Sequence, residues 1–375
     1  MRKLTWTILA MLAFTACSEE DMERQTVADG SVRFAPKTVS DWNAPWTTRA
    51  KAETTTTVQA LQGADGLYLH TTVSPSFDAD KNVTRGTQYT GATFATSETF
   101  YVSGYRYASN SNVNAVAAPN FLSSAPVTYV DSEWKATQGY VMPASTDLID
   151  FFAWFVPEGT SGVMAVNAAG GTQLTYAMPS VISEQPDLLT AVKRNESYNA
   201  EVDYKVDLAF THQLTDVNFV LDENVPPATI TEIAFINVYT TATLNIGGAW
   251  DFTNGTAPEE TKYTLNFSTT GNDGYIVGAE NRTILSGLMM IPQEFSNTQK
   301  IRVKMHIVGE EQPRTLYADL KDTEWEAGST VTYKISASTV NKLRMGTVTY
   351  PSSVITSSIS KKPDKFEISS IGSLS

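Results

Sequence analysis

The chain has 375 residues, of which 42% are hydrophobic and 18% are charged, and its formal net charge is −13 at pH 7. This balance supplies enough apolar material for folded cores and is not that of a disordered chain. The negative charge argues against binding to nucleic acids or to anionic lipid surfaces. Because a domain typically has about 150 residues, the length suggests two domains.

The N-terminus carries the pattern of an export signal. Two basic residues precede an apolar run over 4–14, which is followed by Ala16 and by the chain's single cysteine, Cys17. The run is too short for a membrane-spanning helix, which needs about 20 residues, and one cysteine cannot form an internal disulfide. The arrangement resembles a bacterial lipobox, which predicts a signal peptide over 1–16 and acyl chains on Cys17. The alternative is an ordinary secretory signal with an incidental cysteine.

Residues 17–30 are polar, and we interpret them as a flexible acidic tether. The run Ser18-Glu19-Glu20-Asp21 lies directly after the predicted lipid site and resembles the surface-export tag of Bacteroidetes lipoproteins. We therefore expect a lipid-anchored protein on the outer face of the outer membrane.

A first β-sandwich domain is predicted over 31–199. Short alternating or β-branched runs are typical of strands, and Gly-, Pro- and polar-rich stretches over 40–51 and 74–97 indicate exposed loops. The run over 147–156 is almost continuously apolar, so that strand should be buried on both faces. The expected strands are 31–35, 54–61, 66–73, 98–108, 126–130, 139–142, 147–156, 174–178 and 187–192.

A second β-sandwich domain is predicted over 200–340, after the polar stretch 193–201. Turn signals such as Asn254-Gly255 separate its short runs, and helical periodicity is almost absent, so the fold class is all-β. The expected strands are 204–210, 217–221, 230–239, 242–246, 263–267, 283–291, 300–308, 314–320 and 330–338. The Ser-rich extension 341–375 is either a frayed tail, an extra edge hairpin, or a segment that pairs with another chain.

A search for catalytic or metal-binding motifs finds none, which predicts no enzyme activity, no cofactor and no metal site. The histidines His70, His212 and His306 fall in separate predicted strands, without a carboxylate at ligand spacing. Each is expected to be an ordinary strand residue. Trp325 and Trp42 follow acidic residues, as in some sugar-binding sites, but core or edge packing is the preferred interpretation.

Several segments together resemble the fimbrillin family of Bacteroidetes, over roughly residues 1–340. They are the lipobox, Thr47-Thr48-Arg49-Ala50, Thr84-Arg85-Gly86-Thr87, and the stretches 100–105, 148–157, 185–191 and 206–214. The resemblance implies two transthyretin-like β-sandwich domains in tandem. It also implies a role as a fimbrial (pilus) subunit, tip adhesin or anchor, which supports cell adhesion.

In that family, an Arg-specific protease removes the lipidated N-terminal segment, and a strand of the next subunit then inserts into the groove that is left. Carried over to this chain, the resemblance implies cleavage between Arg49 and Ala50, with Arg85 and Gly86 as a second candidate. The donor strand would lie within 346–375, and the partners would be other pilus subunits and, before processing, the outer membrane. The alternative is a surface lipoprotein that does not polymerise, either a pilus anchor or tip or a module that binds a host protein or a glycan.

Overall fold

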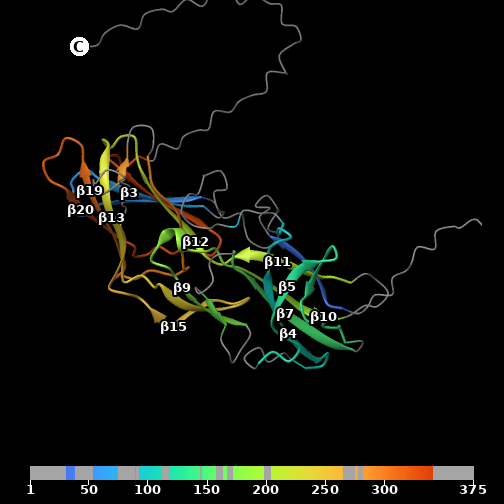
Figure 1. Cartoon of the computed structure of the whole chain (residues 1–375). Coiled ribbons are helices and arrows are strands. Elements are labelled where there is room, and N and C mark those ends of the chain that lie inside the picture. The colour runs from blue at the N-terminus through green and yellow to red at the C-terminus, as the bar shows by residue number, and fades with distance from the viewer. Residues whose placement is uncertain are drawn as a thin grey trace, which may run out of the picture. The chain divides into compact units, whose positions relative to one another are not determined.

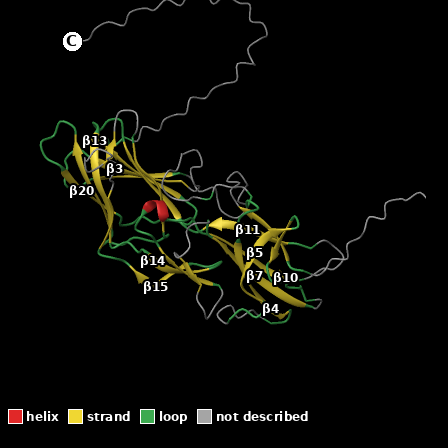
Figure 2. Cartoon of the chain, in the orientation of Figure 1, coloured by secondary structure: helices red, strands yellow, loops and turns green. Residues whose placement is uncertain are grey.

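A computed structural model describes residues 31–38, 54–74, 89, 93–111, 118–143, 146–157, 164–166, 172–197, 204–264, 275–277 and 282–340. The chain divides into a compact unit, Met1–Thr339, and a second unit, Val340–Ser375. The description below concerns the first unit. Its described residues form strands, turns and a single short 3-10 turn at Ile182–Glu184, so the fold is all-β, as predicted (Figure 2).

Seven strands close into a barrel in the order β1-β11-β10-β7-β4-β5-β6 (Figure 1). Their bounds are β1 Arg33–Thr38, β4 Phe100–Ala108, β5 Leu122–Val130, β6 Glu133–Ala136, β7 Asp147–Phe155, β10 Leu189–Glu196 and β11 Val206–His212. The pairing of β6 with β1 closes the ring, and the pairing of β1 with β11 is parallel. Alternate side chains of these strands fill the interior with an aromatic-rich core.

Strand β7 is buried on both faces, as its apolar run predicts. Phe151, Ala153 and Phe155 belong to the core inside the barrel. Phe152 and Trp154 point the other way and belong to a second, larger core. Successive side chains of a strand point to opposite faces, so a strand between two cores needs apolar residues at nearly every position.

The remaining strands form three sheets around the second core. One has the order β18-β12-β21-β3-β2, another β16-β13-β19-β20 with β17 beside β13, and the third β15-β14-β9-β8. Their bounds are β2 Thr55–Ala60, β3 Tyr68–Ser74, β8 Met164–Val166, β9 Gln173–Ala177, β12 Thr215–Leu221, β13 Ala228–Ile236, β14 Thr241–Asn245, β15 Trp250–Thr256, β16 Glu260–Thr264, β17 Tyr275–Val277, β18 Thr283–Met290, β19 Lys300–Ile307, β20 Arg314–Asp319 and β21 Thr330–Ser336.

Strand pairing connects residues on both sides of position 200. β11 completes the barrel beside β1 and β10. In the other direction, β3 pairs with β21, and β9 pairs with β14. The sheets are therefore shared between the segments 31–199 and 200–340.

Some local predictions are wrong. The expected strand over 139–142 makes only an isolated bridge between Val141 and Ser31. The turn expected at Asn254-Gly255 lies inside β15, where a Cβ on Gly255 would come within 2.6 Å of the Thr241 carbonyl oxygen. Here glycine permits a close approach of two backbones rather than a turn.

Strand β6 is not among the strands expected from the sequence, because the turn that joins it to β5 lacks the glycine that usually marks a hairpin. Asp131 and Ser132 connect β5 to β6 with φ values of 52° and 65°. Two positive φ values are typical of the type I′ hairpin turn, which Asn-Gly and Asp-Gly usually occupy.

Candidate functional site

Strand β1 is the described segment that precedes the predicted cleavage site, and its alternating burial makes it part of the barrel wall. Phe34, Pro36 and Thr38 are buried, as is Val32 just before the strand, whereas Lys37 is exposed. The pattern of apolar and small side chains at every second position places one face of β1 in the barrel core.

Phe34 anchors β1 in that core. Its side chain is 2% exposed, and its ring lies edge-on to Phe100 at 6.1 Å and to Phe151 at 5.7 Å between centroids. Edge-to-face pairs at these distances are favourable beyond their buried area. A residue at this position therefore needs a large apolar side chain.

The backbone of β1 is bonded on both sides. Its register with β11 runs from Phe34 opposite Val206 to Thr38 opposite Phe210, and on the other side Phe34 lies opposite Trp134 of β6. Removing β1 would leave a slot between β6 and β11, with two open strand edges and an apolar floor. Such edges are templates for pairing with another chain.

The predicted site residues themselves lie outside the described residues. These are Cys17, Arg49 and Ala50, Arg85 and Gly86, and the donor region 346–375. Arg49 follows Thr38, the last residue of β1, by 49 − 38 = 11 positions. A cut there would separate β1 from the rest of the chain.

A buried acid–histidine pair holds the segment that follows Arg85. Asp187 is fully buried, its Oδ2 lies 2.7 Å from His212 Nδ1, and the Tyr89 backbone N–H donates to the same Oδ2 at 3.1 Å. The Tyr89 ring packs edge-on against Phe155 at 5.0 Å. No sequence spacing indicates this pair, because Asp187 and His212 lie 25 positions apart and meet only through the pairing of β10 with β11.

The other histidines and the tryptophan make structural contacts. His70 Nε2 lies 2.6 Å from the Ser338 carbonyl oxygen, and His306 Nε2 lies 2.8 Å from the Glu310 carbonyl oxygen. Trp325 is 2% exposed and donates to the Tyr333 hydroxyl at 2.9 Å, so core packing is confirmed for this residue. Trp42, for which the same packing was expected, lies outside the described residues. Within the described ranges, no group of three metal-binding side chains is placed to hold an ion.

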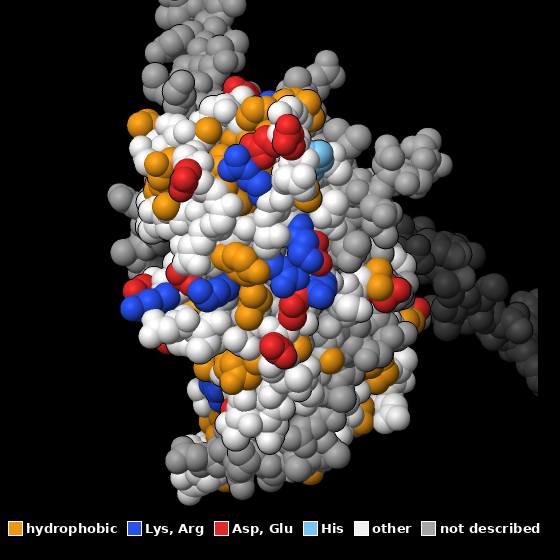
Figure 3. Space-filling model, turned by 90° about the vertical axis from the view of Figure 1, so that its left-hand side faces the viewer, with side chains coloured by type: hydrophobic (Ala, Val, Ile, Leu, Met, Phe, Trp, Pro, Cys, Tyr) orange, Lys and Arg blue, Asp and Glu red, His pale blue; other side chains and the backbone are white. Residues whose placement is uncertain are grey.

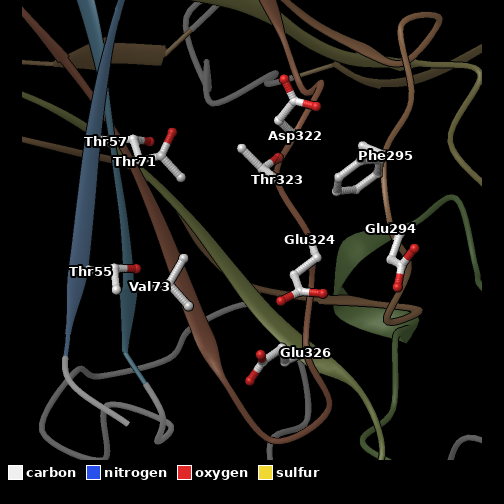
Figure 4. Close-up of a pocket in the computed structure, with 10 residues that line it drawn as sticks. All are labelled: Thr55, Thr57, Thr71, Val73, Glu294, Phe295, Asp322, Thr323, Glu324 and Glu326. Atoms are coloured by element: carbon white, nitrogen blue, oxygen red, sulfur yellow. The ribbon is translucent and has the colours of Figure 1, made fainter.

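A pocket of 610 Å³ opens between β2, β3 and the loop that precedes β21 (Figure 4). Threonines and Val73 of β2 and β3 form one wall, and four carboxylates with Phe295 form the other. The lining residues are Thr55, Thr57, Thr71, Val73, Glu294, Phe295, Asp322, Thr323, Glu324 and Glu326. Nothing in the sequence predicts it, because its two walls are more than 200 positions apart.

The outer face of the β13–β19–β20 sheet carries interleaved basic and acidic side chains (Figure 3). Arg302 binds Glu232 at 2.5 Å and also binds Glu260, and Lys304 binds Glu232 at 3.3 Å. Because these cations are paired with carboxylates, the face presents a salt-bridge network rather than an anion site.

In the part of the chain that the structure describes, no helix has the length and hydropathy that crossing a membrane requires.

Comparison with known proteins gives one family match and several structural likenesses. The sequence profile of a family described as fimbrillin-like matches residues 84–356, which is more than half of the chain. A sequence comparison with curated proteins finds no match.

Three solved structures illustrate the structural likenesses. A fimbrial protein from Bacteroides vulgatus is 18% identical with a TM-score of 0.46, and the match covers 63% of this chain and 90% of that chain. A candidate cell adhesion protein from Bacteroides ovatus is 12% identical with a TM-score of 0.43, covering 65% and 83%. A fimbrial assembly protein from Parabacteroides distasonis is 9% identical with a TM-score of 0.33, covering 75% and 92%.

Proposed function

Because this chain belongs to the fimbrillin-like family, we propose that it is a structural or adhesive subunit of a surface fimbrium. It is exported as a lipoprotein through Cys17, cut between Arg49 and Ala50, and joined to other subunits by strand exchange. The observation that carries the proposal is the position of β1, which precedes Arg49 and closes the barrel between β6 and β11.

The geometry of β1 explains how a cut could switch assembly on. With β1 in place, the barrel is closed at this position, because five residues of β1 pair with β11 and two pair with β6. Once β1 is removed, the core side chains Phe100 and Phe151 lose their contact with the Phe34 ring and become exposed on that side. Exposed apolar surface and unpaired backbone groups both favour insertion of a new strand.

The C-terminal region contains segments that resemble β1 in pattern. In β1, Val32 and Phe34 are two positions apart, and Pro36 follows within the paired strand. In the donor region, Val348 and Tyr350 have the same spacing and are followed by a proline. The proline stands two positions after Phe34 in β1 but directly after Tyr350 in the donor region, so the likeness is limited to the spacing of the apolar residues.

The test is the mature N-terminus of protein purified from the cell surface, compared with an Arg49→Ala variant. We expect the wild-type protein to begin at Ala50 and to form high-molecular-weight ladders on a denaturing gel. The Arg49→Ala variant should keep β1 and should form no ladders. An Arg85→Ala variant is the matched control, because it removes the second candidate cut and leaves Arg49 intact.

Two other outcomes would change the proposal. If only Arg85→Ala abolishes the ladders, processing occurs at Arg85 and releases β1 together with β2 and β3. If the mature protein begins at an acylated Cys17 and never forms ladders, the protein does not polymerise by this route. The function would then be that of a lipid-anchored pilus anchor, a tip subunit or a binding module.

A further inference from the structure

The acidic pocket beside β2 carries a charge that its own residues do not balance. Among the residues that the structure describes, one ion pair involves its lining and joins Asp322 to Lys321 at 4.0 Å, with both side chains more than half exposed. Among the described residues, no cation pairs with Glu294, Glu324 or Glu326. The pocket therefore has a negative potential that a positively charged ligand would relieve.

The carboxylates also repel one another. Partial burial raises the pKa of Glu324 above its ordinary value, and the negative charges of Glu326 and Glu294 raise it further. In Figure 4 the Glu324 and Glu326 side chains extend from the same loop toward the wall formed by β2 and β3. A cation placed between them would reverse this repulsion, since an opposite charge favours the ionised form.

Thr71 supplies a second, independent indication of a ligand. It is 4% exposed, it lines the pocket, and within the described structure its hydroxyl makes no hydrogen bond. The hydroxyl oxygen is not one of the fully enclosed polar atoms that lack a partner, so it can be reached from the pocket although the residue is buried. The pocket thus combines an unused hydroxyl on one wall with uncompensated carboxylates on the other.

The position of β2 indicates the form of the ligand. β2 is the last strand of its sheet, and no described strand pairs with its outer edge. Thr55 and Thr57, which line the pocket, lie on this strand. An extended peptide that runs along the edge would place every second side chain on the pocket side.

We propose that this pocket binds a lysine or arginine side chain of an extended basic segment from a partner protein that lies along β2. The carboxylates of Glu324 and Glu326 accept hydrogen bonds from the cationic group, and the Thr71 hydroxyl oxygen is a further acceptor. This proposal is independent of the strand exchange at β1.

A neutral sugar fits the pocket less well. Phe295, the aromatic residue of the lining, is 7% exposed and packs edge-on against Trp325 at 4.8 Å. It therefore offers little open ring face for stacking on a sugar. The polar lining consists of carboxylates and hydroxyls, which suits a donor-rich cation.

The test uses the full chain from residue 18 and two synthetic peptides of equal length. One is acetyl-Thr-Lys-Thr-Lys-Thr-Lys-Thr-amide, and the other has glutamine at each lysine position. Isothermal titration should give binding of the lysine peptide at least about tenfold tighter than the glutamine peptide. Raising the salt concentration from about 0.05 M to about 0.5 M should weaken it, because exposed charges are screened.

The decisive variant is Glu324→Gln with Glu326→Gln, which should lower the affinity for the lysine peptide at least about tenfold. The matched control is Glu184→Gln with Glu311→Gln, which makes the same change in net charge at exposed positions outside the pocket. Equal binding of the two peptides would overturn the proposal. An equal loss of affinity in both double variants would overturn it too, because it would assign the attraction to the net charge of the protein. Unfolding curves of each variant establish that the fold is retained.

Discussion

Replacing Phe34 by alanine tests whether β1 is a true strand of the barrel. The ring is 2% exposed and makes two edge-to-face contacts, with Phe100 and Phe151. Full burial of a phenylalanine is worth about 1.5–3 kcal/mol, and the cavity left by truncation brings the usual cost of Phe→Ala to about 3–5 kcal/mol. We expect Phe34→Ala to lower the free energy of unfolding of the uncut chain by that amount.

The assay is urea unfolding of the uncut chain from residue 18, followed by circular dichroism and tryptophan fluorescence. Lys37→Ala is the matched control in the same strand, because its ion pair with Asp207 is 3.5 Å long and both side chains are about two-thirds exposed. Exposed pairs contribute about 0–1 kcal/mol, so this variant should unfold almost like the wild type. If Phe34→Ala also stays within about 1 kcal/mol of the wild type, β1 does not hold the barrel together and the slot argument fails.

Two further predictions concern the second core and the charged face. Trp325→Phe should cost about 1–3 kcal/mol in urea unfolding, because it leaves the buried Tyr333 hydroxyl without its donor, and an unchanged midpoint would contradict this. Burial alone would raise the pKa of Glu232, but hydrogen bonds and charge from Arg302 and Lys304 outweigh it, so the native pKa lies below its ordinary value of 4.5. The carboxylate therefore contributes stability above pH 4.5 that is lost as the pH falls through the native pKa. A plot of melting temperature against pH between about 3 and 6 should be less steep for Glu232→Gln than for the wild type.

The sequence predicts the fold class and most strands because burial periodicity is a local property. The apolar run in β7 gives both its location and its two buried faces. Errors in strand prediction arise where glycine is taken as the mark of a turn. Gly255 lies inside β15, and the turn at Asp131 and Ser132 carries no glycine. At Gly255 the close approach of the Thr241 carbonyl oxygen, rather than a turn, accounts for the glycine.

The candidate site was predictable only in part. The resemblance to a family points to Arg49, but only the structure places β1 between β6 and β11. Pairing across more than 160 positions brings β1 to β11, and the two walls of the acidic pocket are more than 200 positions apart. Such contacts depend on the order of strands in a sheet, which the periodicity of one strand does not contain.

The bonding of β1 along both long sides has a mechanical consequence. Five residues of β1 are in register with β11 and two with β6, so a pull along the strand axis loads these backbone hydrogen bonds together, in shear. A pull across the strand would break them one after another and would need less force. A strand seated in the same slot would meet the same geometry. A junction between subunits built there would resist tension best when the load runs along the inserted strand, as it would in a fibre stretched by flow.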